Sequence, residues 1–184
     1  MKPALIVVDM LYEFVYGRLK SPEAEKIVPV IRKLIDEAHK KGVLVIHVID
    51  QHYPFDHELK IWGAHALKGS KEAKIIDELA PQENDIVLPK HSYSGFRGTP
   101  LDNILRDNGI DTVILTGIHT HICVLHTAYD AFYHGYNIIV VKDGVAAFSK
   151  SDHEYALNYM EKVYGAKILE SSKVLEIINE SKHH

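Results

Sequence analysis

The sequence predicts an α/β fold with a doubly wound, mainly parallel sheet of five to six strands and helices on both faces. Five short apolar runs rich in Val and Ile are continuous rather than alternating, which is typical of strands buried on both faces of a parallel sheet. Segments with apolar residues at helical spacing lie between the runs, so right-handed strand–helix–strand crossovers are expected. The length of 184 residues suits one domain. We expect that domain over residues 1–182 and interpret 183–184 as the stub of a purification tag.

The strands are predicted at the apolar runs themselves. Each run is four to six residues long and is followed by polar residues or Gly within a few positions, which matches the usual length of a buried strand. A sixth run is shorter and weaker than the others. The predicted strands are residues 5–8, 43–48, 85–88, 112–115 and 137–141, with 167–169 as the sixth.

The helices are predicted where apolar residues recur every three to four positions. In residues 22–40 such a stripe follows Ser21, a plausible N-cap, and Pro22, which suits the first helical position; Gly42 ends the helix. One stretch, residues 50–70, has no clear period, and loops of that length in compact domains are usually functional. The other predicted helices are residues 70–79, 100–108, 121–133, 151–164 and 172–179.

Composition and charge exclude several classes of protein. With 46% apolar and 25% charged residues, the chain is neither disordered nor collagenous nor a coiled coil. The net charge of −4 is spread along the chain, which argues against nucleic-acid and anionic-membrane partners. Cys123 is the only cysteine, so no internal disulfide can form. No run is long enough for a signal peptide or a membrane span, and we expect a soluble, cytoplasmic protein.

Three chemically active residues follow predicted strands. Asp9, Lys90 and Cys123 each lie at or just beyond a carboxyl end, where open α/β sheets bind ligands. Cys123 also lies near the start of a predicted helix, and a nearby Lys would help to hold it as thiolate. A carboxylate beside both could carry a proton to a leaving group. The plain alternative is that Cys123 is a buried small hydrophobe and Asp9 a turn residue.

The long loop carries a second group of polar residues. Asp50 and His52 lie on one side of an extended chain because side chains repeat every two residues. Together with one or two of His57, Glu58 and His65 they form a nitrogen and oxygen set that suits Zn²⁺, Fe²⁺ or Mn²⁺. The chain has 13 histidines, so chance clustering of surface residues is the alternative.

The chain resembles the isochorismatase-like cysteine hydrolases, and within them the nicotinamidases. The resemblance covers almost the whole chain and is most specific in the segment that contains the cysteine. The matching segments are residues 4–10 (ALIVVDM), Asp50-x-His52, residues 90–101 (KHSYSGFRGTPL) and residues 117–131 (GIHTHICVLHTAYDA).

The resemblance implies an isochorismatase-like hydrolase fold and a role for each residue at the strand ends. Cys123 would be the nucleophile, Asp9 the proton shuttle, and Lys90 the group that supports thiolate and carboxylate. A cis peptide bond is implied between Ile118 and His119. It would turn the backbone N–H of His119 toward that of Cys123, so that the two form an oxyanion hole.

The resemblance also implies a metal site and an aromatic pocket. Asp50, His52 and His65 fill the family's three ligand positions, Glu58 is the expected fourth ligand, and His57 fits the spacing less well. The expected ion is Zn²⁺, with Fe²⁺ or Mn²⁺ as alternatives. The aromatic walls of the substrate pocket are expected from Phe14, Trp62 and Tyr93.

The activity implied is metal-dependent hydrolysis of nicotinamide to nicotinate and ammonia through a thioester, as part of NAD salvage, in a homo-oligomer. The chain departs from most nicotinamidases at His119, at His121 and in the segment Trp62-Gly63-Ala64-His65. The first alternative is therefore an N-carbamoylsarcosine amidase or a ureido-acid hydrolase, with His119 or His121 near a substrate carboxylate. An isochorismatase and a catalytically idle binding module are further alternatives, against which Cys123 argues.

Overall fold

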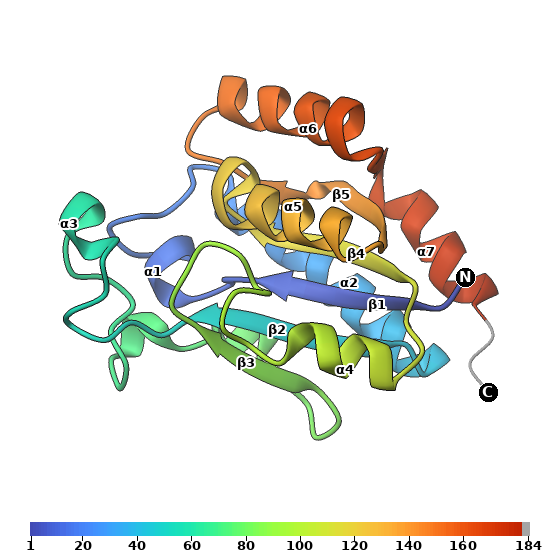
Figure 1. The fold of residues 1–184 in the computed structure, drawn as a ribbon, viewed down its shortest axis with the longest axis horizontal. Coiled ribbons are helices and arrows are strands. Elements are labelled where there is room, and N and C mark those ends of the chain that lie inside the picture. The colour runs from blue at the N-terminus through green and yellow to red at the C-terminus, as the bar shows by residue number, and fades with distance from the viewer. Residues whose placement is uncertain (182–184) are drawn as a thin grey trace.

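The computed structural model describes residues 1–181, and its centre is one six-stranded sheet in the order β3-β2-β1-β4-β5-β6 (Figure 1). Every neighbouring pair of strands is parallel, which confirms the predicted fold class. The first three strands extend the sheet in one direction and the last three in the other, so the order reverses between β1 and β4. The strands are β1 (Pro3–Val8), β2 (Leu44–Asp50), β3 (Ile86–Lys90), β4 (Thr112–Ile118), β5 (Asn137–Ala146) and β6 (Lys167–Leu169).

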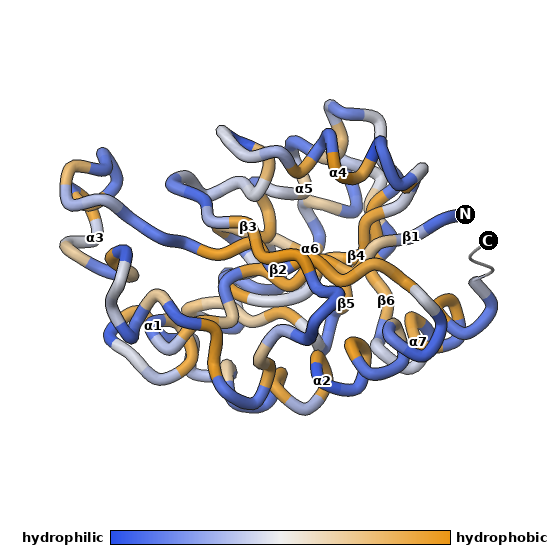
Figure 2. The backbone as a smooth tube through the Cα atoms, turned by 90° about the horizontal axis from the view of Figure 1, so that it is seen from below, coloured by the Kyte–Doolittle hydropathy of each residue, from blue (hydrophilic) through white to orange (hydrophobic). Residues whose placement is uncertain are grey.

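Helices cover both faces of the sheet, because each buried strand alternates its side chains between two apolar layers. In β1, Leu5 and Val7 contact the layer of helices α1, α2 and α7, whereas Ile6 and Val8 contact the layer of α4, α5 and α6. Figure 2 shows the apolar strands with α4 and α5 on one side and α1, α2 and α7 on the other. The helices are α1 (Tyr12–Val15), α2 (Ala24–Lys41), α3 (Leu59–Trp62), α4 (Leu101–Asp107), α5 (Leu125–Tyr133), α6 (Lys150–Tyr164) and α7 (Ser171–Glu180). No helix in residues 1–181 is both long and apolar enough to cross a membrane.

Two predictions about helices are wrong. Residues 70–79 form two 3₁₀ turns, Lys71–Ala73 and Asp77–Leu79, instead of a helix. The backbone between them is extended because it pairs with the chain after β1: the N–H of Tyr12 donates to Lys74 at 3.0 Å, and that of Ile76 donates to Met10 at 3.0 Å. These long-range hydrogen bonds replace those of a helix.

Ser21 is not the cap of α2. The helix begins at Ala24 after Glu23, and the hydroxyl of Ser21 donates to the backbone oxygen of Ala147 at 2.5 Å, while it accepts from the N–H of Glu23. Ser21 therefore ties the chain before α2 to the segment after β5. The predicted end of α2 is correct, because Gly42 adopts the left-handed conformation that closes it.

The strands β4 and β5 continue beyond their apolar runs. The added residues of β4 pair with the end of β1, and the strand order reverses between these two strands. Gly117, near the end of β4, has φ 112°, and a Cβ there would lie 1.9 Å from the carbonyl oxygen of Val8. Only glycine allows β1 and β4 to approach so closely. Because β5 continues to Ala146, Lys142 and Asp143 lie within the strand, and Asp143 accepts the N–H of Ser171 at the start of α7.

Candidate active site

The carboxyl ends of β1, β3 and β4 bring Asp9, Lys90 and Cys123 together. Asp9 follows β1, Lys90 is the last residue of β3, and Cys123 lies in a π-helical turn (Thr120–Val124) between β4 and α5. The Lys90 ammonium lies 3.0 Å from Oδ2 of Asp9, 2.5 Å from Oδ1 of Asp50 and 3.5 Å from the sulfur of Cys123. All four residues are buried. The three residues predicted from separate strands thus form one cluster, in which Lys90 is the central cation.

The backbone around Asp9 holds its carboxylate toward this cluster. Asp9 has φ 51°, a conformation that is uncommon for residues other than glycine and is often found at functional sites. Its N–H donates to Val48 at 2.9 Å, and its Oδ1 accepts the N–H of Asp50 at 2.7 Å. The carboxylate is therefore fixed by the chain at the end of β2, and Oδ2 is the oxygen that faces Lys90.

Burial disfavours the charged form of each group in the cluster, and the neighbouring charges decide in which direction each pKa shifts. Burial and the neighbouring Asp50 carboxylate raise the pKa of Asp9 to about 6, although Lys90 opposes this. Burial would also raise the pKa of Asp50, but Lys90 and His52 outweigh it and lower the pKa to about 2. Burial alone would lower the pKa of Lys90, but the two carboxylates raise it well above its ordinary value. Of the two carboxyl groups that contact Lys90, Asp9 is therefore the one able to exchange a proton near neutral pH.

The thiol of Cys123 differs from the expectation that Lys90 and a helix start hold it as thiolate. Burial raises the pKa of the Cys123 thiol well above its ordinary value, and the carboxylates of Asp9 and Asp50 add to this, whereas Lys90 opposes it. Cys123 lies in the π-helical turn that leads directly into α5, two residues before the first residue of that helix. A protonated thiol beside a carboxylate of raised pKa can be activated by proton transfer to that carboxylate.

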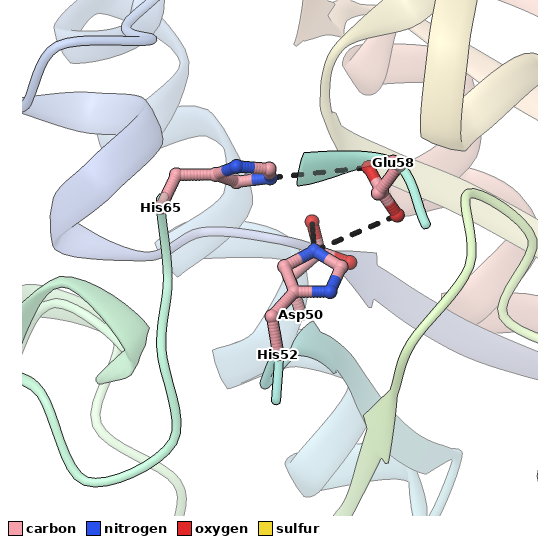
Figure 3. Close-up of side chains that lie close together, drawn as sticks. All are labelled: Asp50, His52, Glu58 and His65. Carbon is pink, nitrogen blue, oxygen red and sulfur yellow. Dashed lines mark ion pairs between the residues drawn. The ribbon is translucent and has the colours of Figure 1, made fainter. Parts of the chain in front are cut away.

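Four side chains that could bind a metal converge beside this cluster (Figure 3). Each of Asp50, His52, Glu58 and His65 offers one ligand atom, and these atoms all lie within 4.8 Å of one another. Nε2 of His52 lies 3.4 Å from Asp50 and 3.5 Å from Glu58, and Nε2 of His65 lies 3.9 Å from Glu58. His57 is exposed and does not belong to this group.

The donor set fits a divalent transition metal. Nε2 of His52 is buried and has no hydrogen-bond partner among residues 1–181, which is an unusual situation unless the nitrogen binds something else. In His65 the other ring nitrogen donates to the carbonyl oxygen of Gly63 at 2.8 Å, which leaves Nε2 to face the carboxylates. Two imidazole nitrogens and two carboxylates are a common ligand set for Zn²⁺, Fe²⁺ or Mn²⁺.

A narrow slot with aromatic walls opens above Cys123. The three predicted wall residues, Phe14, Trp62 and Tyr93, all line it, and Trp62 Nε1 donates to the Tyr93 hydroxyl at 3.0 Å. Leu19, Ile122 and Phe148 line the slot as well and were not predicted. Phe148 follows the extended end of β5, and a longer strand prediction there was the one signal that could have placed it at the site. The remaining lining residues are Asp50, Glu58, His65, His119 and Cys123.

The two histidines that depart from most nicotinamidases lie in different surroundings. His119 lines the slot, stacks on Phe148 with ring centroids 3.9 Å apart, and donates from Nε2 to the carbonyl oxygen of Leu19 at 2.8 Å. Burial lowers the pKa of His119 to about 4, so the ring is neutral at physiological pH. His121 lies outside the slot, with Nε2 3.6 Å from Asp152. The peptide bond between Ile118 and His119 is cis, as expected.

Residues 3–172 match the family model described as the isochorismatase domain. The chain belongs to the isochorismatase family. It is 52% identical to the N-carbamoylsarcosine amidase of Thermoplasma acidophilum. This match covers 93% of this chain and 97% of the amidase, with a TM-score of 0.88. It is 32% identical to the nicotinamidase PncA of Bacillus subtilis, over 92% and 100% of the two chains with a TM-score of 0.88. It is 34% identical to the zinc complex of the pyrazinamidase of Pyrococcus horikoshii, over 92% and 99% with a TM-score of 0.84.

These similarities confirm the predicted superfamily, the isochorismatase-like hydrolases, and the predicted fold. The expected class of enzyme, a hydrolase that acts on a carbon–nitrogen amide bond, agrees with the family and with the activities named for the three similar structures. Amidases with different substrates stand among them, so the substrate has to be argued from the slot itself.

Proposed function

We propose that this chain is a metal-dependent cysteine amidohydrolase for a small uncharged aromatic carboxamide of the nicotinamide type, which it converts to the carboxylic acid and ammonia. One observation carries the substrate class: the slot above Cys123 has aromatic walls, and no Lys or Arg is among the described residues that line it. Aromatic walls favour contact with a flat neutral ring, whereas a substrate carboxylate would lack a cationic side chain there.

In the proposed reaction, Asp9 and Cys123 share one proton. Asp9 takes the thiol proton of Cys123, the sulfur attacks the carboxamide carbon, and the backbone N–H groups of His119 and Cys123 stabilise the resulting oxyanion. When the C–N bond breaks, Asp9 returns the proton to the departing ammonia. Asp9 then takes a proton from the water that attacks the thioester. When the C–S bond breaks and the acid leaves, Asp9 returns this proton to the sulfur and the thiol is restored. The ion pairs of Lys90 hold the carboxylates of Asp9 and Asp50 in place.

Asp50, His52, Glu58 and His65 are proposed to hold the metal. A bound divalent ion would supply a Lewis-acid site for a lone pair of the substrate, such as a ring nitrogen. The crystal structure of the similar pyrazinamidase of P. horikoshii is a complex with zinc, which favours Zn²⁺ over Fe²⁺ or Mn²⁺.

We expect one divalent transition metal per chain. The measurement is elemental analysis of protein made without a histidine tag, since tag histidines also bind metal. Removing the His52 imidazole should weaken metal binding strongly, because its buried Nε2 lies close to the carboxylates of both Asp50 and Glu58. Glu58→Ala should weaken it less, since Asp50, His52 and His65 remain. Metal-free protein with full activity would contradict this prediction. Unchanged metal binding in Glu58→Ala would show only that Glu58 is not a ligand.

A second candidate function, hydrolysis of N-carbamoylsarcosine or a related carbamoyl amide, is favoured by the 52% identity to the T. acidophilum amidase. The chemistry at Cys123 would be the same. The difference is a substrate carboxylate, for which His119 is a poor partner because it is neutral and its Nε2 hydrogen already binds Leu19. An isochorismatase or an idle module is disfavoured by the intact cluster of Asp9, Lys90 and Cys123.

Ammonia release from nicotinamide, benzamide and N-carbamoylsarcosine tests the proposal. Benzamide has the shape of nicotinamide without the ring nitrogen, so kcat/KM should fall by about 10²–10⁴ relative to nicotinamide. N-carbamoylsarcosine should be a poor substrate. The proposal fails in favour of the second candidate if the two aromatic amides react at equal rates, N-carbamoylsarcosine is preferred, and His119→Ala or His121→Ala selectively raises its KM.

Three further expectations remain predictions: a part in NAD salvage, a cytoplasmic location, and assembly into a homo-oligomer. Large exposed aromatic side chains gather on α5 and α6, including Tyr129, Tyr133 and Tyr155. Exposed apolar surface of this kind often marks a contact with another protein. This face is where we expect copies of the chain to meet.

A further inference from the structure

We propose that Asp56 is a positioning residue of the metal site, which presents His52 to the metal in one tautomer, and that His91 holds Asp56 in place. The inference rests on the proposed function, because it concerns the same four metal ligands. It adds two residues outside that ligand set, one of which is contributed by the chain just after β3.

The geometry of His52 shows why its tautomer depends on Asp56. The His52 side chain is fully buried, and its Nδ1 lies 2.8 Å from Oδ2 of Asp56. A carboxylate accepts hydrogen bonds, so the single proton of a neutral imidazole stays on Nδ1. The lone pair of Nε2 is then free on the side of Asp50 and Glu58, which lie 3.4 and 3.5 Å away. Carboxylate–histidine pairs of this kind orient metal-binding imidazoles and raise their basicity.

Asp56 is itself held by two other groups. Its Oδ2 also accepts the backbone N–H of Tyr53 at 3.1 Å and lies 3.0 Å from Nδ1 of His91. The Tyr53 ring stacks on that of His91, with centroids 4.7 Å apart and planes 10° from parallel. His91 directly follows Lys90, so these contacts link the long loop to the end of β3. The Asp56 side chain is about 10% exposed, and it is therefore shielded without being cut off from solvent.

The other histidine of the proposed metal site has no comparable side-chain partner among residues 1–181. Nδ1 of His65 donates to the backbone oxygen of Gly63, which no substitution removes. Among the described residues, Asp56 is thus the one side chain that orients a histidine of the metal group through its second ring nitrogen. Substituting it should change metal affinity without removing a ligand.

The test is the dissociation constant for Zn²⁺, measured by competition with a chelating dye on the metal-stripped full chain. Asp56→Ala should bind Zn²⁺ about 10- to 100-fold more weakly than the wild type. Asp56→Asn, which keeps an acceptor oxygen without the charge, should lose less, and this partial rescue separates orientation from general damage. The visible spectrum of bound Co²⁺ should change in Asp56→Ala. Asp152→Ala, which breaks the carboxylate–histidine pair with His121 outside the slot, is the matched control and should leave the Zn²⁺ affinity unchanged.

Zn²⁺ affinity of Asp56→Ala equal to the wild type would overturn the positioning role while the proposed metal site stood. A wild type that binds no metal would instead refute the metal site of the proposed function. If Asp56→Ala does not fold, Asp56→Asn and His91→Ala decide: both should bind Zn²⁺ more weakly, and unchanged affinity in both overturns the inference.

Discussion

Cys123→Ala is expected to lower kcat/KM for amide hydrolysis by at least about 10⁴-fold, the scale on which removal of a catalytic nucleophile acts. The chain holds no second thiol that could replace the sulfur. Lys90 and Asp9, which lie beside the sulfur, cannot form a thioester. The measurement is ammonia release from nicotinamide at substrate concentrations well above and below KM.

The fold of this variant should survive, because the substitution removes one buried sulfur atom and the ion pairs of Lys90 with Asp9 and Asp50 remain. Circular dichroism and a thermal melt check this. Cys123→Ser should retain a trace of activity at best, since a hydroxyl is much harder to deprotonate than a thiol. Full turnover by Cys123→Ala, or by wild-type protein after complete alkylation of the thiol, would refute the assignment of the nucleophile.

Asp9→Asn is expected to lower kcat by about 10²–10⁴, the usual contribution of a general acid–base. An amide of the same shape can still accept the N–H of Asp50, so the local backbone should be kept, but it can neither take the thiol proton nor return it to ammonia. KM should change much less than kcat, because Asp9 does not line the slot proposed to bind the substrate ring. Steady-state kinetics with nicotinamide separate the two constants.

The matched control is Asp152→Asn, the same substitution at an exposed carboxylate near His121, which should leave kcat unchanged. Because Asp9→Asn also removes one of the two carboxylates around Lys90, its Zn²⁺ content should be measured alongside activity. A variant that keeps its metal and loses kcat supports the proton-transfer role. Wild-type kcat in Asp9→Asn would contradict it.

The amino-acid sequence determined most of the sheet. Strands buried on both faces need continuous apolar residues, and all six observed strands overlap predicted runs. Strands β1 to β5 extend beyond those runs by two residues or more, β5 the furthest. The polar residues that follow such runs must lie at one edge of a parallel sheet. Asp9, Lys90 and Cys123 could therefore be predicted to lie close together, and the structure places them so. The family resemblance added the expected roles of these residues and the wall positions of Phe14, Trp62 and Tyr93.

Packing decided what local patterns could not. Residues 70–79 have a helical pattern but pair with the chain after β1, since hydrogen bonds between distant segments outweigh a weak local preference. Phe148 enters the slot because β5 runs past its apolar residues. In the same way, the contact of Asp56 with His52 depends on a loop without any period.

The charge of the site also belongs to the tertiary structure. The types of residue in the cluster can be read from the sequence, but their protonation depends on burial and on distances between separate strands. A lysine near Cys123 was expected to favour the thiolate, yet Lys90 lies between two carboxylates that offset its charge, and burial raises the pKa of the Cys123 thiol. Sequence determined which groups meet at the edge of the sheet. Only the folded chain decided which of them carries the proton, because the energy of a charge depends on its neighbours in space and on its distance from water.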